Sequence, residues 1–181
     1  MTLMRAQREP RAGEPAGAPS PPEIDTLYAA HFHGLTAQLY AYTGDFGVAQ
    51  EIVQEAFCRA IPRWSTIVTY HDPVAWLRRV AFNLAKSRWR KMRSAAAYRR
   101  RHREEYAPEP SPDRVALVAA LAKLPPQQRL AIVLFYLADM PIAEIARGNG
   151  CSEANVKVWL YRGRAALASH LSDLREGRGR D

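Results

Sequence analysis

Apolar residues recur every three or four positions over two long stretches of the chain, residues 23–93 and 115–176. This spacing places them on one face of an α-helix. Residues 1–22 and 94–114 lack the pattern and are rich in proline and charge. Such segments bury too little apolar surface to offset the entropy that is lost on ordering. The pattern predicts a disordered tail over 1–22 and two small helical domains joined by a flexible linker over 94–114.

The first domain is predicted to be a bundle of three helices. The first helix begins near Ile24, and the second follows Asp45, which stands at an N-cap position. The third helix starts after Asp72, because an aspartate N-cap followed by Pro73 at the first helical position favours initiation. The alternation that is typical of strands occurs only briefly, over residues 65–70. The predicted fold class is therefore all-α.

The second domain ends in a helix, a tight turn and another helix. Pro141 begins a short helix, and the glycines in residues 148–150 tolerate the left-handed backbone that ends it. Ser152 is the predicted N-cap of the last helix, whose apolar side includes Val156 and Leu160. Its outward residues are Asn155, Lys157, Tyr161, Arg162 and Arg164. This is the helix-turn-helix pattern, in which the second helix enters a DNA major groove. An ordinary helical hairpin with a solvated basic face is the alternative.

The formal net charge of +8 favours a polyanionic partner, either nucleic acid or an acidic membrane surface. Cys58 and Cys151 belong to no metal-ligand or disulfide pattern, so we expect no metal and no cofactor. No apolar run approaches the roughly 18 residues of a membrane span, and the N-terminus lacks the apolar core of a signal peptide. We expect a cytoplasmic protein that does not enter a membrane.

Two consecutive helices of the first domain carry opposite charges. The third helix mixes aromatic, amide and cationic side chains, namely Trp76, Arg79, Asn83, Lys86, Arg88 and Arg90. Aromatic rings can stack on unpaired bases while cations follow the strand backbone. The preceding helix carries Glu51 and Glu55, and it should avoid DNA and face a basic protein surface. The alternative is that the rings are core and the charges are solvated faces, but the contrast between the helices favours two partners.

Together these segments resemble the sigma factors of the extracytoplasmic-function (ECF) group of bacterial RNA polymerase, over about residues 23–175. The similar stretches are DFGVAQEIVQEAF from Asp45, PVAWLRRVAFNLAKSRW from Pro73, LPPQQRLAIVLFY from Leu124 and SEANVKVWLYRGRAAL from Ser152. The resemblance implies a sigma-2-like bundle over 23–93 and a sigma-4-like helix-turn-helix domain over 115–176. It implies core RNA polymerase and promoter DNA, both duplex and melted, as partners, and an anti-sigma factor as a further one.

The resemblance also implies roles for individual residues. Docking on polymerase would use Asp45, Glu51, Gln54, Glu55 and Phe57, some of them by packing rather than contact. The melted minus-ten strand would be met by Asn83, Lys86, Arg88 and Arg90, together with Trp76 and Arg79 of the same helix. Residues 67–72 correspond to a loop that receives a flipped-out base, where Tyr70 or His71 offers a stacking surface. The minus-thirty-five duplex would be met by Ser152, Asn155, Lys157, Tyr161, Arg162 and Arg164.

The recognition helix departs from the family's frequent Thr-Val-Lys-Ser-Arg-Leu. Here the stretch from Asn155 reads NVKVWL, so Val158 replaces the serine and Trp159 replaces the arginine. Trp159 lies beside the apolar stripe, which favours packing, and Asn155 is the better candidate for a base contact. The sequence therefore does not predict which promoter bases are recognised.

Two other classes of protein are alternatives to this interpretation. A conventional helix-turn-helix regulator would bind duplex DNA without polymerase, but the acidic helix and the strand-binding helix argue against it. An enzyme finds little support, because His31 and His33 have no partner ligands nearby in sequence and no glycine-rich phosphate loop occurs. We therefore expect a DNA-binding initiation factor without catalytic activity.

Overall fold

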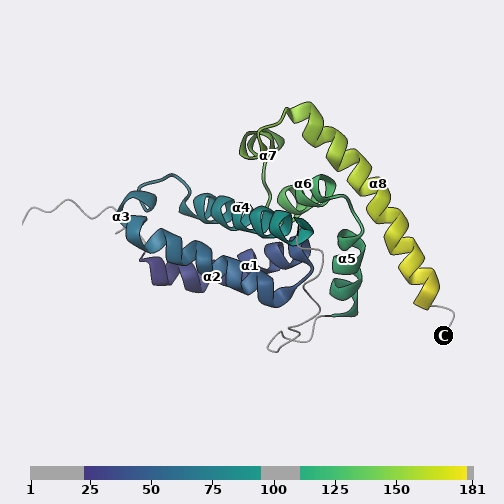
Figure 1. Ribbon diagram of the computed structural model, residues 1–181, viewed down its shortest axis with the longest axis horizontal. Helices are drawn as coiled ribbons and strands as arrows, with labels where there is room; N and C mark the ends of the chain where they lie inside the picture. Colours follow the sequence, from purple (N-terminus) through teal and green to yellow (C-terminus); the bar gives the residue numbers. More distant parts are fainter. Residues whose placement is uncertain (1–22, 95–110, 179–181) are drawn as a thin grey trace, which may run out of the picture.

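The computed structural model describes residues 23–94 and 111–178, and within these ranges every regular element is a helix (Figure 1). The all-α prediction is confirmed. The predicted tail over 1–22 and residues 95–110 of the predicted linker lie outside the described residues. Residues 65–70 form no strand, because they contain the end of a short helix followed by a turn.

The first unit is a three-helix bundle with a short helical connection. Its elements are α1 (Ile24–Thr43), α2 (Phe46–Ala60), the 3-10 turn η1 (Ile61–Arg63), α3 (Trp64–Ile67) and α4 (Pro73–Ser94). The Asp45 carboxylate accepts a hydrogen bond from the Val48 amide at 2.9 Å, and Asp72 accepts one from Ala75 at 2.9 Å. Both predicted N-caps are confirmed. Gly44, with φ of 78°, provides the left-handed residue that ends α1.

Three helices share the core of the first unit. Leu39 of α1, Ile52 and Val53 of α2, and Leu77 of α4 are almost completely buried. Burying each such side chain contributes about 1.5–3 kcal/mol. The core therefore fixes α4 against α2 and leaves one face of each helix outside.

The second unit consists of α5 (Pro112–Ala122), α6 (Pro126–Tyr136), α7 (Ile142–Asn149) and α8 (Glu153–Arg178). The Ser111 side chain caps α5. Both ends of the range 94–114 are therefore helical, with α4 running to Ser94 and α5 starting at Pro112. Pro141 is the N-cap of α7 rather than its first residue, and Gly150, with φ of 62°, ends that helix as expected.

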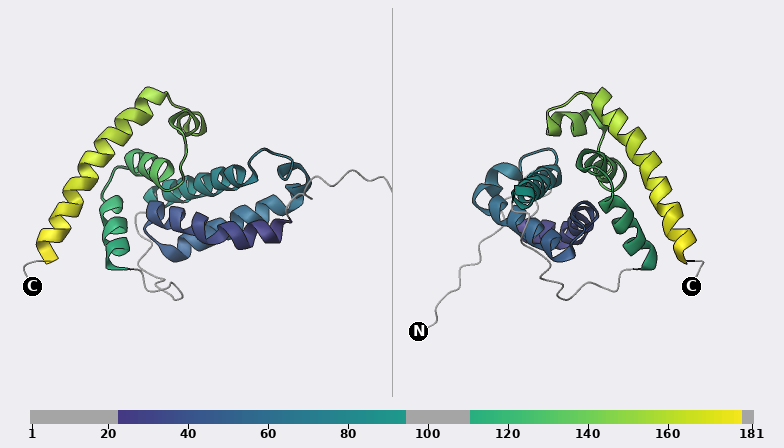
Figure 2. Two further views of the ribbon diagram at one scale, coloured as in Figure 1. Left: turned by 180° about the vertical axis from the view of Figure 1, so that it is seen from behind. Right: turned by 45° about the vertical axis from the view of Figure 1, so that its right-hand side comes forward.

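The two units pack against each other (Figures 1 and 2). Helices α5 and α6 contact α1 of the first unit, and the long α8 packs on α5, α6 and α7. Gly163 allows α8 to cross α6 closely, because a Cβ atom at this position would lie 3.0 Å from Cγ1 of Ile132. The interface between the units is the feature that positions the candidate binding surfaces described below.

Candidate nucleic-acid interface

Helix α8 presents a polar and basic face to solvent. The Ser152 hydroxyl accepts a hydrogen bond from the Asn155 amide at 3.2 Å, so the predicted N-cap is confirmed. Val156, Leu160 and Gly163 are buried against the rest of the unit. The side chains on the opposite side are all exposed, namely Asn155, Lys157, Tyr161, Arg162 and Arg164. Since α7 ends in a left-handed glycine directly before α8, the geometry is that of a helix-turn-helix.

One residue of α6 contributes to this face and was missed by the sequence analysis. The Arg164 guanidinium donates a hydrogen bond to the Tyr136 hydroxyl at 3.3 Å, and Tyr136 is itself 48% exposed. This contact joins Arg164 to an exposed residue of α6 at the edge of the outer face of α8. Trp159 is half-buried and packs against the core, so its side chain is directed away from that face.

Helix α4 carries a stripe of three polar or cationic residues, Arg79, Asn83 and Lys86. Steps of four and three residues place them on one face of the helix. Arg79 and Asn83 are exposed, and Lys86 is half-buried. Phe82 is 3% exposed and belongs to the core, whereas Trp76 is partly buried and packs against that core. A DNA contact by Trp76 stays a prediction. The side chains of Trp89 and Arg90 lie outside the described residues.

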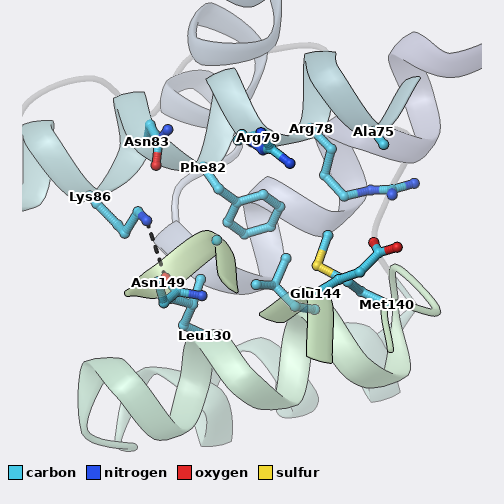
Figure 3. Close-up of a pocket in the computed structure, with 12 residues that line it drawn as sticks. Ala75, Arg78, Arg79, Phe82, Asn83, Lys86, Leu130, Met140, Glu144 and Asn149 are labelled. Atoms are coloured by element: carbon cyan, nitrogen blue, oxygen red, sulfur yellow. Dashed lines mark hydrogen bonds between the residues drawn. The ribbon is translucent and has the colours of Figure 1, made fainter. Parts of the chain in front are cut away.

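The stripe faces the second unit across a narrow cavity of about 50 Å³ (Figure 3). Side chains of α4 line one wall, and Leu130, Met140 and Glu144 are among those that line the other. The Lys86 ammonium donates a hydrogen bond to Oδ1 of Asn149, in the last turn of α7, at 3.2 Å. The structure therefore brings Lys86, one of the candidate strand-binding residues, against the end of α7. No local pattern in the sequence indicates this contact, because the two residues are 63 positions apart.

The loop before α4 lies at the other end of that helix. Tyr70 is 44% exposed and His71 is also exposed, while Ile67 is buried and anchors the start of the loop. From Pro73 to Lys86 the helix rises about 20 Å, at about 1.5 Å per residue. The two groups of predicted strand-binding residues are thus spread along α4, a length that suits several nucleotides of an extended strand.

Helix α2 presents the predicted acidic face. Glu51, Gln54 and Glu55 are exposed, whereas Phe57 is 4% exposed and packs edge to face on Tyr28 at 4.9 Å between ring centroids. Phe57 can therefore support the face only through packing. The carboxylate of Asp45 is engaged as the N-cap.

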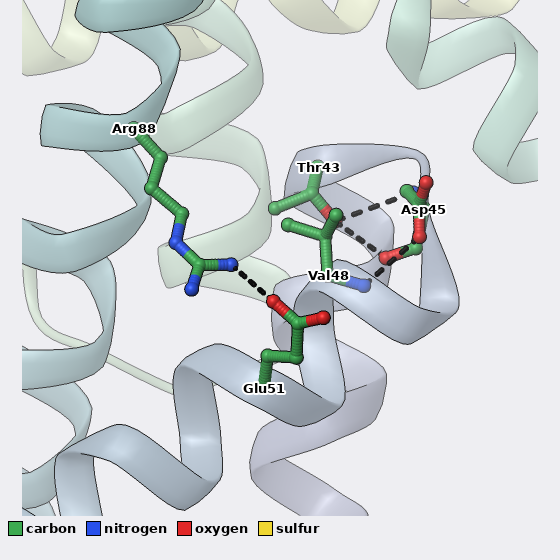
Figure 4. A network of polar contacts seen from close by, with 5 residues as sticks. All are labelled: Thr43, Asp45, Val48, Glu51 and Arg88. Carbon is green, nitrogen blue, oxygen red and sulfur yellow. Dashed lines mark hydrogen bonds and ion pairs between the residues drawn. The ribbon is translucent and has the colours of Figure 1, made fainter. Parts of the chain in front are cut away.

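An ion pair joins the acidic helix to the basic one. The Arg88 guanidinium of α4 lies 2.8 Å from Oε2 of Glu51 on α2 (Figure 4). Glu55 pairs with Arg59 one turn later on the same helix, at 2.7 Å. Both pairs are exposed, so each contributes little stability and either partner can exchange it for another one. A polymerase contact at Glu51 and a strand contact at Arg88 would both break the first pair.

A half-buried arginine, Arg129, connects the two units. The guanidinium of Arg129 in α6 donates hydrogen bonds to the backbone carbonyls of Tyr42 at 3.0 Å, Ala122 at 2.7 Å and Leu124 at 3.2 Å. Burial lowers the pKa of Arg129, and the neighbouring Tyr42 partly opposes this shift. Burial likewise raises the pKa of Tyr42, and the positive charge of Arg129 opposes it. Gln38 of α1 adds a second bond across the interface, from its amide to the Leu137 carbonyl at 3.0 Å.

The described residues contain no group of three or more His, Cys, Asp or Glu side chains that could hold a metal ion. Among the same residues, no helix combines the length and the apolar character that crossing a bilayer would require.

Comparison with known proteins agrees with the division of the chain into two helical units. A family model described as Sigma-70 region 2 matches residues 27–95, and one described as Sigma-70, region 4 matches residues 114–167. The RNA polymerase sigma-E factor of Streptomyces coelicolor is 33% identical over 126 residues, covering 68% of this chain and 71% of that protein. The ECF RNA polymerase sigma factor SigJ of Mycobacterium tuberculosis is 33% identical over 165 residues, covering 81% of this chain. The chain belongs to the ECF sigma factors.

This sigma factor spans 50% of the length of SigJ, so it shares only part of that relative's chain. Among solved structures, the sigma factor RpoE in complex with the anti-sigma factor NepR from Bartonella quintana matches with a TM-score of 0.68. The identity is 21%, over 82% of this chain and 96% of that one. At this identity the similarity shows the fold, and the fold is that of ECF sigma factors.

Proposed function

We propose that this sigma factor binds core RNA polymerase and directs it to promoters, where it promotes opening of the DNA. The observation that carries the proposal is the presence, in one chain, of an exposed helix-turn-helix face on α8 and a cationic stripe on α4. A regulator that binds only duplex DNA would need the first face and not the second. In this role the protein acts in the cytoplasm with the polymerase and catalyses no reaction itself.

The outer face of α8 is proposed to read the minus-thirty-five duplex. Asn155 can pair with an adenine edge, and Arg162 and Arg164 can meet guanine or phosphate. Lys157 and Tyr161 add a phosphate contact and an apolar edge. Because the Ser152 hydroxyl already caps α8, its contribution is to set the start of the helix, where the backbone amides favour a phosphate.

Helix α4 and the loop before it are proposed to hold the opened minus-ten strand. Arg79, Lys86, Arg88 and Arg90 would follow the strand backbone, and Asn83 would meet a base. Tyr70 and His71 are exposed at the start of the helix, where a flipped base needs a stacking surface. The DNA opens when the free energy of binding the unpaired strand exceeds the free energy of base pairing that is lost. The contacts from α4 and its preceding loop would supply this binding free energy.

The acidic face of α2 is proposed to dock on a basic surface of polymerase. Glu51, Gln54 and Glu55 are exposed on one side of the helix, and the ion pairs that they form are weak enough to be exchanged. Asp45 and Phe57 would fix the start and the packing of this helix. An anti-sigma factor is a further proposed partner, since the related fold of RpoE is found with one.

The test is reconstitution with core polymerase, followed by selection of bound promoters from genomic DNA and mapping of transcript starts. We expect the complete chain to direct initiation at defined sites and to bind duplex DNA only weakly without polymerase. Asn83→Ala should reduce promoter opening, measured by permanganate reactivity of thymines, whereas Asn155→Ala should reduce upstream footprinting. Tight duplex binding without polymerase, combined with no initiation, would show a conventional regulator instead.

A further inference from the structure

We propose that a cavity between α1 and α5 binds a small amphipathic acid, a molecule with a carboxylate, an apolar body and a hydroxyl group. None of the residues that line this cavity is among those proposed above to touch DNA or polymerase. The site therefore goes beyond the proposed function, and its ligand would stabilise the folded chain by contacting both α1 and α5.

The cavity exists because the residues of α1 that line it include small ones. Gly34, Ala37 and Ala41 follow one another at steps of three and four residues, which places them on one face of the helix. A Cβ atom added at Gly34 would meet no heavy atom within 4 Å. The cavity has a volume of about 540 Å³, and sites for small molecules typically have volumes of about 300–1,000 Å³. Ala37 is exposed, so the cavity is open to solvent.

Apolar side chains from both units form much of the cavity wall. Leu117 and Val118 of α5 line it, together with Leu137 directly after α6. Tyr40 and Phe46 line it from the first unit, and their rings pack edge to face at 5.7 Å between centroids. A ligand gains free energy here mainly by removing these apolar surfaces from water. The larger part of the ligand is therefore apolar.

Two buried polar atoms of the cavity lining have no hydrogen-bond partner among the described residues. Thr36 lines the cavity and is 2% exposed, and its Oγ1 atom is unpaired. Oε1 of Gln38 is also buried and unpaired, while the amide nitrogen of the same side chain donates to the Leu137 carbonyl. Buried polar groups are nearly always paired, and an unpaired one costs free energy that a ligand can recover. A ligand hydroxyl can accept a hydrogen bond from Thr36 or donate one to Gln38.

The exposed rim of the cavity carries a cation. Arg114 and His33 both line the cavity and are exposed. Arg114 forms no ion pair within the described part of the chain, and none of the described residues that line the cavity is acidic. A guanidinium without a competing carboxylate favours an anion, and its planar fork matches the two oxygens of a carboxylate. The ligand is therefore an acid rather than an alcohol or an amine.

Isothermal titration calorimetry of the complete chain with β-hydroxydecanoate tests the proposal. Decanoate lacks the hydroxyl group, and the corresponding diol lacks the carboxylate, so each control ligand removes one polar group. We expect β-hydroxydecanoate to bind about fivefold more tightly than decanoate and about tenfold more tightly than the diol. At about one hundred times its Kd it should raise the midpoint of thermal unfolding by about 5 °C.

A variant that fills the cavity shows where the ligand binds. Ala37→Trp places a large side chain in the opening and should weaken binding of β-hydroxydecanoate about tenfold or more. Ala30→Trp is the matched control, because Ala30 is exposed on the same helix and does not line the cavity. Circular dichroism establishes that both variants fold. Equal affinity of the two variants, or no binding by the unaltered chain, would overturn the proposal.

Two further variants test the polar groups one at a time. Thr36→Val keeps the shape of the side chain and removes the unpaired hydroxyl, so the ligand-free protein should be no less stable. The same variant should bind β-hydroxydecanoate and decanoate equally. Arg114→Gln should bind β-hydroxydecanoate and the diol equally, because the cation that favours the carboxylate is gone. A preference that survives its matching variant would contradict the role given to that residue. These measurements need neither polymerase nor DNA, so their outcome is independent of the proposed function.

Discussion

Replacing Arg129 should destabilise the second unit and loosen its contact with the first. The guanidinium donates to three backbone carbonyls: that of Ala122 at the end of α5, that of Leu124 in the connection to α6, and that of Tyr42 in the first unit. A hydrogen bond from a charged donor contributes about 1.5–3 kcal/mol. Arg129→Met keeps most of the apolar stem and removes all three bonds.

The loss is smaller than the sum of three bonds, because the side chain is only partly buried and water can reach some of the freed carbonyls. We expect the free energy of unfolding to fall by about 2 kcal/mol. Urea unfolding followed by circular dichroism measures this change as a lower midpoint. Arg147→Met is the matched control, since Arg147 is an exposed cation of α7 and makes no side-chain hydrogen bond in the described structure.

The control should leave the midpoint nearly unchanged. If Arg129→Met shifts the midpoint no more than Arg147→Met, the three hydrogen bonds do not stabilise the fold. Arg129→Lys keeps the positive charge but changes the geometry of the donor group. One ammonium group cannot reach carbonyls on both sides of the interface, as the planar guanidinium does. We expect the lysine variant to recover only part of the lost stability.

Three further predictions concern packing, titration and sequence reading. Gly163→Ala should lower stability by about 1 kcal/mol in thermal unfolding, because overpacking against Ile132 outweighs the gain in helix propensity; an unchanged midpoint would contradict the close crossing. Burial raises the pKa of Tyr42 in the folded protein above that in the unfolded chain, so the unfolded chain loses this proton first as pH rises. The free energy of unfolding should therefore be unaffected below about pH 10 and should fall as pH rises through the pKa of the folded protein. Tyr42→Phe should lack this dependence. Val158 is 44% exposed on α8 and can pack on the methyl group of a thymine in the major groove. Replacing that thymine by uracil removes the methyl group and should weaken upstream binding about fourfold. Val158→Ala should reduce the difference between the two bases.

Local signals in the sequence determined where the helices begin and which side of α8 faces outward. Asp45, Asp72 and Ser152 were predicted as N-caps and are N-caps in the structure. These features depend on hydrogen bonds within three residues of the cap, so a short stretch of sequence is sufficient to specify them. The outward face of α8 follows in the same way from the helical period.

The roles of aromatic residues were harder to predict from the same pattern. Trp76 and Phe82 lie on a helix rich in cations, which is equally typical of a stacking surface and of an amphipathic helix. In the structure Phe82 belongs to the hydrophobic core and Trp76 packs against that core, because α1 and α2 cover that side of α4. Which side of a helix is covered depends on its neighbours, and a single helix does not carry that information.

Only the tertiary structure decided that Lys86, at one end of the α4 stripe, lies against the last turn of α7. The bonds from Lys86 to Asn149, from Arg129 to Tyr42 and from Gln38 to Leu137 join residues that are 63, 87 and 99 positions apart. No periodicity or motif relates such positions, because their proximity depends on how two separately folded units dock. The sequence by itself determined two units with three charged faces, and the docking of the units decided which of their residues meet across the interface.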